Sequence, residues 1–348
     1  MKLKGQHLLS SAQFDIDTLN YLYNLIDILV PVARGQLQTD ILHGAVMGSL
    51  FFEASTRTRL SFDAAFMRLG GSVSNTTGVS FSSIVKGESL EDTARVIGGY
   101  FDVLVVRHQE EQAIYDIATA TNCPLINGGN GAGEHPTQAL LDMYTLNAEF
   151  KRMDKQINGS TIAMVGDLRH GRTVHSLMRL LSLYKNITFN LVAPNFLSMP
   201  DKFIQLAGDL GHTIIQTENL QEGIKAADMI YATRVQKERF AEAGDYVYSD
   251  AFRINAAMIN TYCKKDMVIM HPLPRDAREG ANDLSSDLNA DTRLAIFRQS
   301  DAGVPTRMAL FATILGVDKD IAKSLRQSSW FTPKYSGPQD APWYKMRS

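Results

Sequence analysis

The 348-residue sequence has little that would tie it to export or to a membrane. Its N-terminus contains no apolar core of signal-peptide length, and no apolar run reaches the roughly 18 residues that cross a bilayer. It has only two cysteines, Cys123 and Cys263, and their separation matches no metal-site spacing. So few cysteines suit a reducing compartment. We therefore expect a cytoplasmic protein.

The chain also lacks a strong charge of either sign, since its formal net charge is −2. A nearly neutral protein has no global attraction for nucleic acid or for an anionic membrane. Any anionic ligand must therefore be held by a local cluster of donors. The length is sufficient for two domains, and the 45% hydrophobic content is that of an ordinary globular protein.

Short runs rich in Val, Ile and Leu alternate with longer segments of helical period. This rhythm predicts an α/β fold with two domains, each a parallel sheet flanked by helices (doubly wound). A polar break near 150–160 separates two sets of units, joined through a helix over 135–150. The expected strands read GAVMGSLFF, DVLVVR, CPLIN, TIAMVG, ITFNLVA, DMIYAT and MVIMH, and a Pro-, Ser- and Gly-rich tail ends the chain.

The stretch FFEASTRTRLSF places several hydroxyl residues and two arginines directly after an expected strand, at the start of a helix. A helix start offers free N–H groups and a positive dipole end, which favour an anion. Arg57 can bind two phosphate oxygens at once. A capped helix with a solvated arginine is the alternative, but a cap needs only one hydroxyl. The run Ser55, Thr56 and Thr58 therefore favours an anion site.

Two further segments fit the same site. Arg107 stands at the carboxyl end of an expected strand, where open α/β sheets bind ligands. The glycine-rich stretch GGNGAGEHPTQ ends in His135 at a helix start, with Thr137 and Gln138 as further neutral donors. A surface ion pair and a structural cap are the respective alternatives for Arg107 and His135.

The stretch VGDLRHGRT differs from a nucleotide-binding P-loop at its key position, because Arg172 stands where lysine is required. Arginine is a poor replacement there and is better suited to binding a carboxylate. A nucleotide hydrolase is thus the less favoured interpretation.

Two later segments also follow expected strands. The first, ATRVQKERF, carries several charged residues, and a solvated helix start is its alternative interpretation. The second, MHPLPRD, contains two prolines that stiffen a loop and leave backbone carbonyls free to point into a site.

The stretches FFEASTRTRLSF, HPTQALLDM, RHGRTVHSL, TRVQKER and HPLPR resemble motifs of the aspartate/ornithine carbamoyltransferase family, in the family order. They span residues 51–275. Ornithine members share the STRTR site but carry a cysteine-containing loop in place of HPLPR. The resemblance therefore implies an aspartate carbamoyltransferase activity in pyrimidine biosynthesis, with no metal and no organic cofactor.

The resemblance also implies the domain roles. Residues 1–140 would bind carbamoyl phosphate and be completed by a C-terminal helix at about 298–325. Residues 141–297 would bind aspartate, and 326–348 would form the tail. The active unit would be a homotrimer whose sites are shared between subunits.

Residue roles follow by resemblance at matching positions. The phosphate would be bound by Ser55, Thr56, Arg57, Thr58 and Arg107, and the carbonyl polarised by Thr58, Arg107 and His135. The carbamoyl NH2 would be held by Gln138 and the backbone carbonyls of Leu273 and Pro274. Aspartate would be bound by Arg172, Arg234 and Gln236, with Ser82 and Lys86 supplied by a neighbouring subunit. Glu53 and Arg239 would act in domain closure.

The chain departs from the family pattern in a few places. Val85 replaces a second lysine beside Lys86, and Glu134 stands before His135 where the family often has an amide. The departure at Glu134 leaves open a carbamoyltransferase for another amino acid. Together the departures weigh against association with a separate regulatory chain. A catalytically silent relative is a further alternative, but it would have lost at least one of the key arginines or His135.

Overall fold

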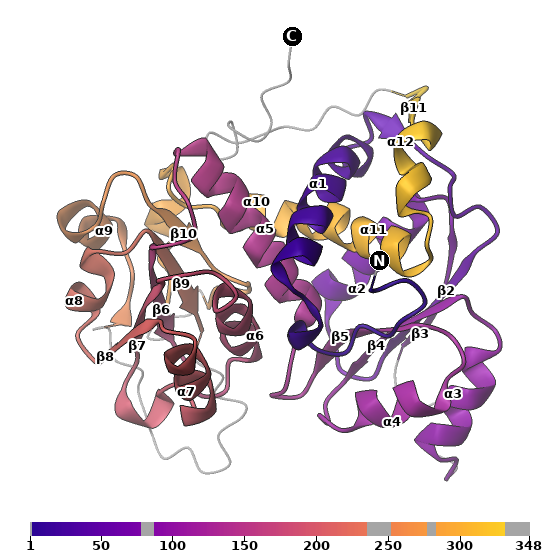
Figure 1. The fold of residues 1–348 in the computed structure, drawn as a ribbon, viewed down its shortest axis with the longest axis horizontal. Helices are drawn as coiled ribbons and strands as arrows, with labels where there is room; N and C mark the ends of the chain where they lie inside the picture. The colour runs from indigo at the N-terminus through magenta and orange to yellow at the C-terminus, as the bar shows by residue number, and fades with distance from the viewer. Residues whose placement is uncertain (1, 78–86, 235–251, 277–282, 331–348) are drawn as a thin grey trace. The chain divides into compact units, whose positions relative to one another are not determined.

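The computed structural model describes residues 2–77, 87–234, 252–276 and 283–330. The chain divides into two compact units. One is built from Met1–Leu140 and from the segment that begins at Asp301, and the other spans Leu141–Ser300. Each unit contains a parallel sheet with helices on both faces, so the predicted fold class is confirmed (Figure 1). The division falls between Leu140 and Leu141, inside helix α5 Pro136–Arg152, so the polar stretch near 150–160 lies wholly in the second unit.

The sheet of the first unit has four parallel strands in the order β3-β2-β4-β5. Helices α3 and α4 cover one face, and α1, α2 and α11 cover the other (Figure 1). The two central strands are buried nearly throughout, which explains their continuous apolar runs. The bounds are β2 Val46–Phe51, β3 Ser72–Thr77, β4 Val103–His108, β5 Leu125–Asn130, α1 Ile16–Ala33, α2 Thr56–Arg68, α3 Leu90–Gly98 and α4 Ala113–Ala120.

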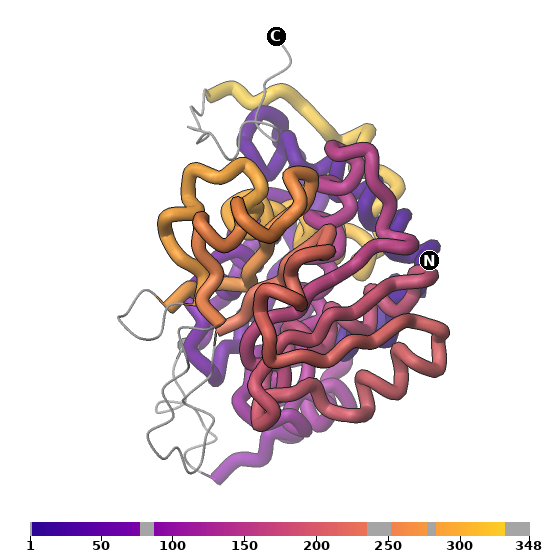
Figure 2. Tube along the Cα trace, turned by 90° about the vertical axis from the view of Figure 1, so that its left-hand side faces the viewer, coloured from indigo at the N-terminus to yellow at the C-terminus, as the bar shows by residue number. Residues whose placement is uncertain are grey.

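Helix α11 Gly303–Ile314 is buried along its whole length and packs against α1 and α2. Phe311 lies edge-on to Phe62 and Phe66, with ring centroids 5.9 and 5.0 Å away. In Figure 2 this yellow segment runs beside the indigo N-terminal helix. Sequences far apart along the chain therefore share one core.

The single C-terminal helix predicted at about 298–325 is wrong, because this region contains several shorter helices. Gly316 has φ +73°, a left-handed conformation that suits glycine and ends α11. The helices are α10 Ile296–Asp301, α11, the 3-10 turn η8 Asp318–Asp320 and α12 Ile321–Ser324.

The sheet of the second unit has five parallel strands in the order β10-β9-β6-β7-β8. Helices α6 and α7 lie on one face, and α8 and α9 on the other (Figure 1). The strands are β6 Thr161–Gly166, β7 Thr188–Val192, β8 Thr213–Thr217, β9 Met229–Thr233 and β10 Val268–Met270. The helices are α6 Arg172–Leu181, α7 Asp201–Asp209, α8 Leu220–Lys225 and α9 Ala256–Tyr262, with 3-10 turns η4 Asn195–Leu197 and η7 Ser286–Ala290.

Four strands were not predicted from the sequence. Strands β3 and β8 lie at sheet edges, and β8 leaves most of its side chains exposed or half-buried, so neither has an apolar run. Strand β3 includes the polar residues 74–77. The other two, β1 Leu37–Gln38 and β11 Arg326–Gln327, pair antiparallel, so the predicted tail begins with residues that join the first unit. A 3-10 turn, η1 Ser11–Gln13, precedes α1.

Candidate active site

In each sheet the chain first adds strands on one side and then returns to add the remaining strands on the other side. In the first unit the chain passes from β2 to β3 on one side and then to β4 on the other. Open α/β sheets bind ligands outside the carboxyl ends of strands at such a switch point. Helix α2 starts directly after β2, and Arg107 lies near the end of β4. The Phe52 N–H donates to the Arg107 carbonyl at 2.9 Å and holds the two strand ends together.

The STRTR segment forms the first turn of α2. Ser55 is the N-cap residue, yet its side chain makes no capping hydrogen bond. Thr56 and Arg57 are exposed, and Thr58 is half-buried. The hydroxyl that the capping alternative requires is therefore not used as a cap. This favours an anion site at the helix N-terminus.

Arg107 is buried, with 7% of its surface exposed, and its guanidinium contacts Gly128 and Glu53. Its Nη1 donates to the Gly128 carbonyl at 3.3 Å, and its Nη2 lies 3.0 Å from Glu53 Oε2. Glu53 thus pairs with a predicted phosphate ligand in this structure. Its predicted closure partner Arg239 lies outside the described residues.

His135 is buried at the start of α5, where its carbonyl accepts the Ala139 N–H at 3.1 Å. Its ring Nδ1 lies 3.5 Å from the Thr137 hydroxyl. The turn before it is fixed by Asn130, whose side-chain oxygen accepts the Glu134 N–H at 2.9 Å. The His135 ring is thus carried by a rigid turn at the end of β5, and half-buried Gln138 follows one turn along.

Glu134 contacts the N-terminal segment of the chain. Its carboxylate accepts hydrogen bonds from the Ser10 hydroxyl at 2.7 Å, and from the N–H and hydroxyl of Ser11 at 2.8 and 2.6 Å. This departure from the family pattern therefore has a structural explanation. It gives no support to a different amino-acid substrate.

The second unit has its own switch point, between β6 and β9. Gly166, the last residue of β6, has φ +119°, and a Cβ there would lie 2.1 Å from the Thr233 carbonyl oxygen. Only glycine allows this approach of the two strand ends. Arg172 is the first residue of α6 and is buried, and half-buried Arg234 directly follows β9. Both predicted carboxylate ligands therefore flank this switch point.

The turn between β6 and α6 is fixed by Asp167, which is fully buried. Its carboxylate accepts the His170 N–H at 2.9 Å and lies 3.2 Å from that residue's ring Nδ1. These contacts define the path of the chain that leads to Arg172.

The HPLPR segment follows β10, which neighbours β9. Leu273 has φ +57° and is followed by a cis peptide bond to Pro274. A leucine with positive φ is uncommon and occurs where surrounding contacts hold it. At the end of the segment, Arg275 Nη1 donates to Asn289 Oδ1 at 2.9 Å.

Besides Arg239, the predicted site residues Ser82, Lys86 and Gln236 lie outside the described residues. Within the described ranges, no group of three or more His, Cys, Asp or Glu side chains could hold a metal ion. Likewise, none of the described helices is long and apolar enough to cross a bilayer.

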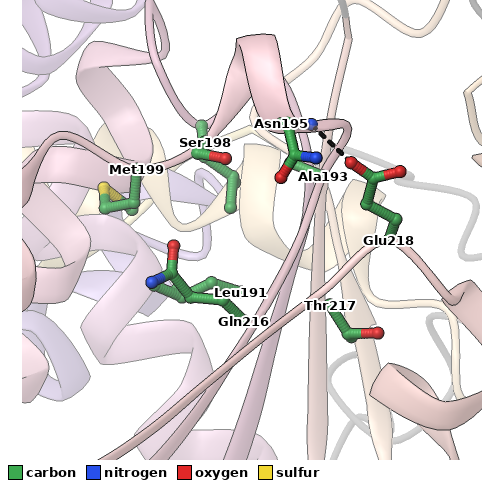
Figure 3. Close-up of a pocket in the computed structure, with 9 residues that line it drawn as sticks. Leu191, Ala193, Asn195, Ser198, Met199, Gln216, Thr217 and Glu218 are labelled. Carbon is green, nitrogen blue, oxygen red and sulfur yellow. Dashed lines mark hydrogen bonds between the residues drawn. The ribbon is translucent and has the colours of Figure 1, made fainter.

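A cavity of about 280 Å³ lies at the carboxyl ends of β7 and β8 (Figure 3). The Glu218 carboxylate closes one side by accepting the Asn195 N–H at 2.9 Å. Among the predicted ligand residues that the structure describes, none lines it. The cavity is instead lined mainly by residues that follow β7 and β8, with Leu168 contributed by the turn after β6.

Comparisons with known proteins agree with this arrangement. Residues 6–148 match the model of the aspartate/ornithine carbamoyltransferase carbamoyl-P binding domain, and residues 158–314 match that of the Asp/Orn binding domain. The chain belongs to the aspartate/ornithine carbamoyltransferase family.

Within this family, the similar curated proteins include aspartate carbamoyltransferase catalytic subunits. The one from Dichelobacter nodosus is 50% identical over the full length of both chains, and the one from Saccharophagus degradans is 48% identical over 95% of this chain and 98% of its own. Among solved structures, aspartate transcarbamoylase from Trypanosoma cruzi in complex with N-(phosphonacetyl)-L-aspartic acid is 41% identical, with a TM-score of 0.82. That match covers 90% of this chain and 97% of the other.

Proposed function

We propose that this chain is an aspartate carbamoyltransferase. It transfers the carbamoyl group of carbamoyl phosphate to the amine of L-aspartate and releases N-carbamoyl-L-aspartate and phosphate, a reaction of de novo pyrimidine biosynthesis. The observation that carries the proposal is the full-length 50% identity to an aspartate carbamoyltransferase catalytic subunit. The cationic and hydroxyl side chains at the two switch points support it.

The first unit supplies the phosphate-binding groups and His135 in this proposal. The N-terminal turn of α2 and Arg107 bind the phosphate, because backbone N–H groups, hydroxyls and guanidinium groups all favour an anion. Thr58, Arg107 and His135 donate to the carbonyl oxygen. Gln138 and the carbonyls of Leu273 and Pro274 accept from the carbamoyl NH2.

The second unit supplies the aspartate site. Arg172, Arg234 and Gln236 bind the two carboxylates, for which the planar guanidinium is well matched. Ser82 and Lys86 from a neighbouring subunit complete the ligand set in a homotrimer.

Location in the cytoplasm also stays a prediction from the sequence, and the free thiols of Cys123 and Cys263 are compatible with it.

The chemistry needs no group beyond these side chains. The neutral aspartate amine attacks the carbamoyl carbon, forming a C–N bond and placing negative charge on the carbonyl oxygen. Fixed donors stabilise that oxyanion. The C–O bond to phosphate then breaks, the phosphate leaves with the electron pair of that bond, and it accepts the proton that the amine loses.

A direct assay tests the proposal. The purified chain is incubated with carbamoyl phosphate and either aspartate or ornithine, and the carbamoyl-amino acid is measured colorimetrically. Product is expected with aspartate only. Product with ornithine alone, or no product with either, would refute the proposal.

Binding of N-(phosphonacetyl)-L-aspartic acid gives an independent test. One ligand that occupies both anion sites loses rigid-body entropy only once, so calorimetry should show far tighter binding than for phosphate or aspartate. Arg57→Ala and Arg172→Ala should each weaken it. Affinity no better than that of phosphate would contradict the two-anion-site model.

A further inference from the structure

His271, the first residue after β10, makes two hydrogen bonds through its ring. Its Nδ1 accepts the Leu273 main-chain N–H at 2.9 Å, and its Nε2 lies 2.7 Å from Asp283 Oδ2. A main-chain N–H can only donate, so Nδ1 carries no proton. Nε2 must then carry the ring proton and donate it to the carboxylate. The contacts therefore select one neutral tautomer of His271.

The ring has no freedom to change partners, because it is 1% exposed and Asp283 is 3% exposed. The other carboxylate oxygen of Asp283 accepts the Leu284 N–H at 2.8 Å. Turning the imidazole would leave buried polar groups without partners, which is costly. The ring therefore provides a fixed acceptor for Leu273.

The backbone of His271 is tied to a second buried chain of hydrogen bonds. Its N–H donates to Gln299 Oε1 at 2.9 Å, and Gln299 Nε2 donates to Asp142 Oδ1 at 2.6 Å. The other Asp142 oxygen accepts the Tyr231 hydroxyl at 2.6 Å. Burial, and then the charge of Asp142, raise the pKa of Tyr231 well above its usual value, so the phenol remains a donor. These hydrogen bonds connect the segment after β10 to Tyr231 of β9, which lies three residues before Arg234.

We propose that His271 is a positioning residue that sets the direction of the Leu273 carbonyl and thereby selects a carbamoyl group over an acetyl group. The proposal rests on the proposed function, in which that carbonyl accepts from the carbamoyl NH2. Leu273 has φ +57°, a backbone conformation that is energetically unfavourable for leucine, so contacts must hold it there. The bond from its N–H to His271 Nδ1 supplies that restraint.

Acetyl phosphate is the probe for this contact, because a methyl group replaces the NH2 and cannot donate to Leu273. Wild-type protein should therefore bind carbamoyl phosphate more tightly than acetyl phosphate. Inorganic phosphate, which lacks both groups, is the internal control for the anion site. All three are measured as inhibition or Michaelis constants in the aspartate assay.

Two variants separate the two ring contacts. His271→Asn places an amide oxygen near the position of Nδ1 and keeps the acceptor for Leu273, whereas His271→Gln keeps a donor near Nε2 for Asp283 and loses that acceptor. His271→Gln should reduce the preference for carbamoyl over acetyl phosphate by about three- to tenfold, the loss of one hydrogen bond. His271→Asn should keep the preference within about twofold, and phosphate inhibition should not change in either variant.

The outcomes can be told apart. Equal preferences in the two variants would overturn the positioning role, since each loses one buried contact and a purely structural defect would affect both alike. Wild-type protein without N-carbamoyl-aspartate product would instead refute the proposed function. If neither variant folds, ¹⁵N NMR of the wild-type histidine rings decides. A proton on Nδ1 of His271 would overturn the inference, and a proton on Nε2 alone supports it.

Discussion

The Arg107 guanidinium and the Glu53 carboxylate form an ion pair, with Nη2 3.0 Å from Oε2. Arg107 is nearly buried, whereas Glu53 is 29% exposed at its side chain. An acid inside an anion-binding segment would repel phosphate unless it were paired. In this structure its partner is one of the predicted phosphate ligands.

This pair leads to a prediction for Glu53→Gln. Without the competing carboxylate, phosphate should bind at least as tightly as in wild type, with a gain of up to about fivefold, the range of a partly exposed ion pair. Aspartate binding and turnover should weaken if Glu53 also serves in closure. Calorimetry with phosphate measures the first effect, and weaker phosphate binding in the variant would contradict the competition between Glu53 and phosphate.

The two arginine clusters should respond differently to truncation. Arg57→Ala should lower kcat by about 100-fold or more, because charge on the leaving phosphate grows in the transition state. Arg234→Ala should mainly raise the aspartate KM, by about ten- to a hundredfold, since the carboxylate is bound in ground and transition states alike. Steady-state kinetics distinguish these effects. A similar mild rise in KM for both variants would show that the role assignment is wrong.

Breaking the ion pair between Glu149 and Arg298 should strongly destabilise the second unit. Both side chains are fully buried, and Arg298 Nε lies 2.5 Å from Glu149 Oε1. Glu149→Gln would leave a buried guanidinium uncompensated and should reduce the free energy of unfolding by about 3–5 kcal/mol. Arg152→Gln, which removes the partly exposed partner of Glu149, is the matched control and should cost less than about 1 kcal/mol. Urea denaturation checks both, and equal losses would argue against the effect of burial.

His175 predicts an acid-sensitive contribution to stability. Burial lowers its pKa from 6.5 to about 4, and its Nε2 donates to the Leu168 carbonyl at 2.8 Å. The unfolded chain binds this proton more readily, so the contribution is complete above pH 6.5 and is lost as the pH falls toward about 4. The loss should reach about 3 kcal/mol.

The control for this prediction is His175→Gln, which keeps a donor near Nε2 but does not titrate. Unfolding by urea is followed at pH 7, 5.5 and 4.5 for both proteins. Wild type should lose more stability than the variant over this range. Parallel curves would mean that His175 is not the group responsible.

Shared active sites would allow two inactive variants to rescue each other. Lys86→Ala chains and His135→Ala chains are unfolded and refolded together. In a mixed trimer some sites combine an intact Lys86 with an intact His135 from its neighbour. Activity above the sum of the separately refolded variants is expected. Mixed trimers that form without such a gain would exclude sharing through Lys86.

The sequence by itself determined the parallel strands with buried side chains and the residues that follow them. Strands β4 and β6 could be predicted because burial on both faces demands continuous apolar runs. Ser55, Thr56, Arg57, Thr58, Arg172 and Arg234 could be placed at strand ends because parallel strands carry their ligands at one edge. The edge strands β3 and β8 were missed because half-exposed strands need no such run.

Only the tertiary structure decided which polar side chains meet. Glu134 binds Ser10 and Ser11, more than 120 positions earlier in the chain, and no local pattern encodes that distance. The same holds for Asp142, Gln299 and His271, which come from α5, α10 and the end of β10. A lone Asp or Gln in a helix looks like a solvated residue in the sequence. Such a residue contributes to the fold only when folding buries it, because a buried polar group must form its hydrogen bonds within the protein.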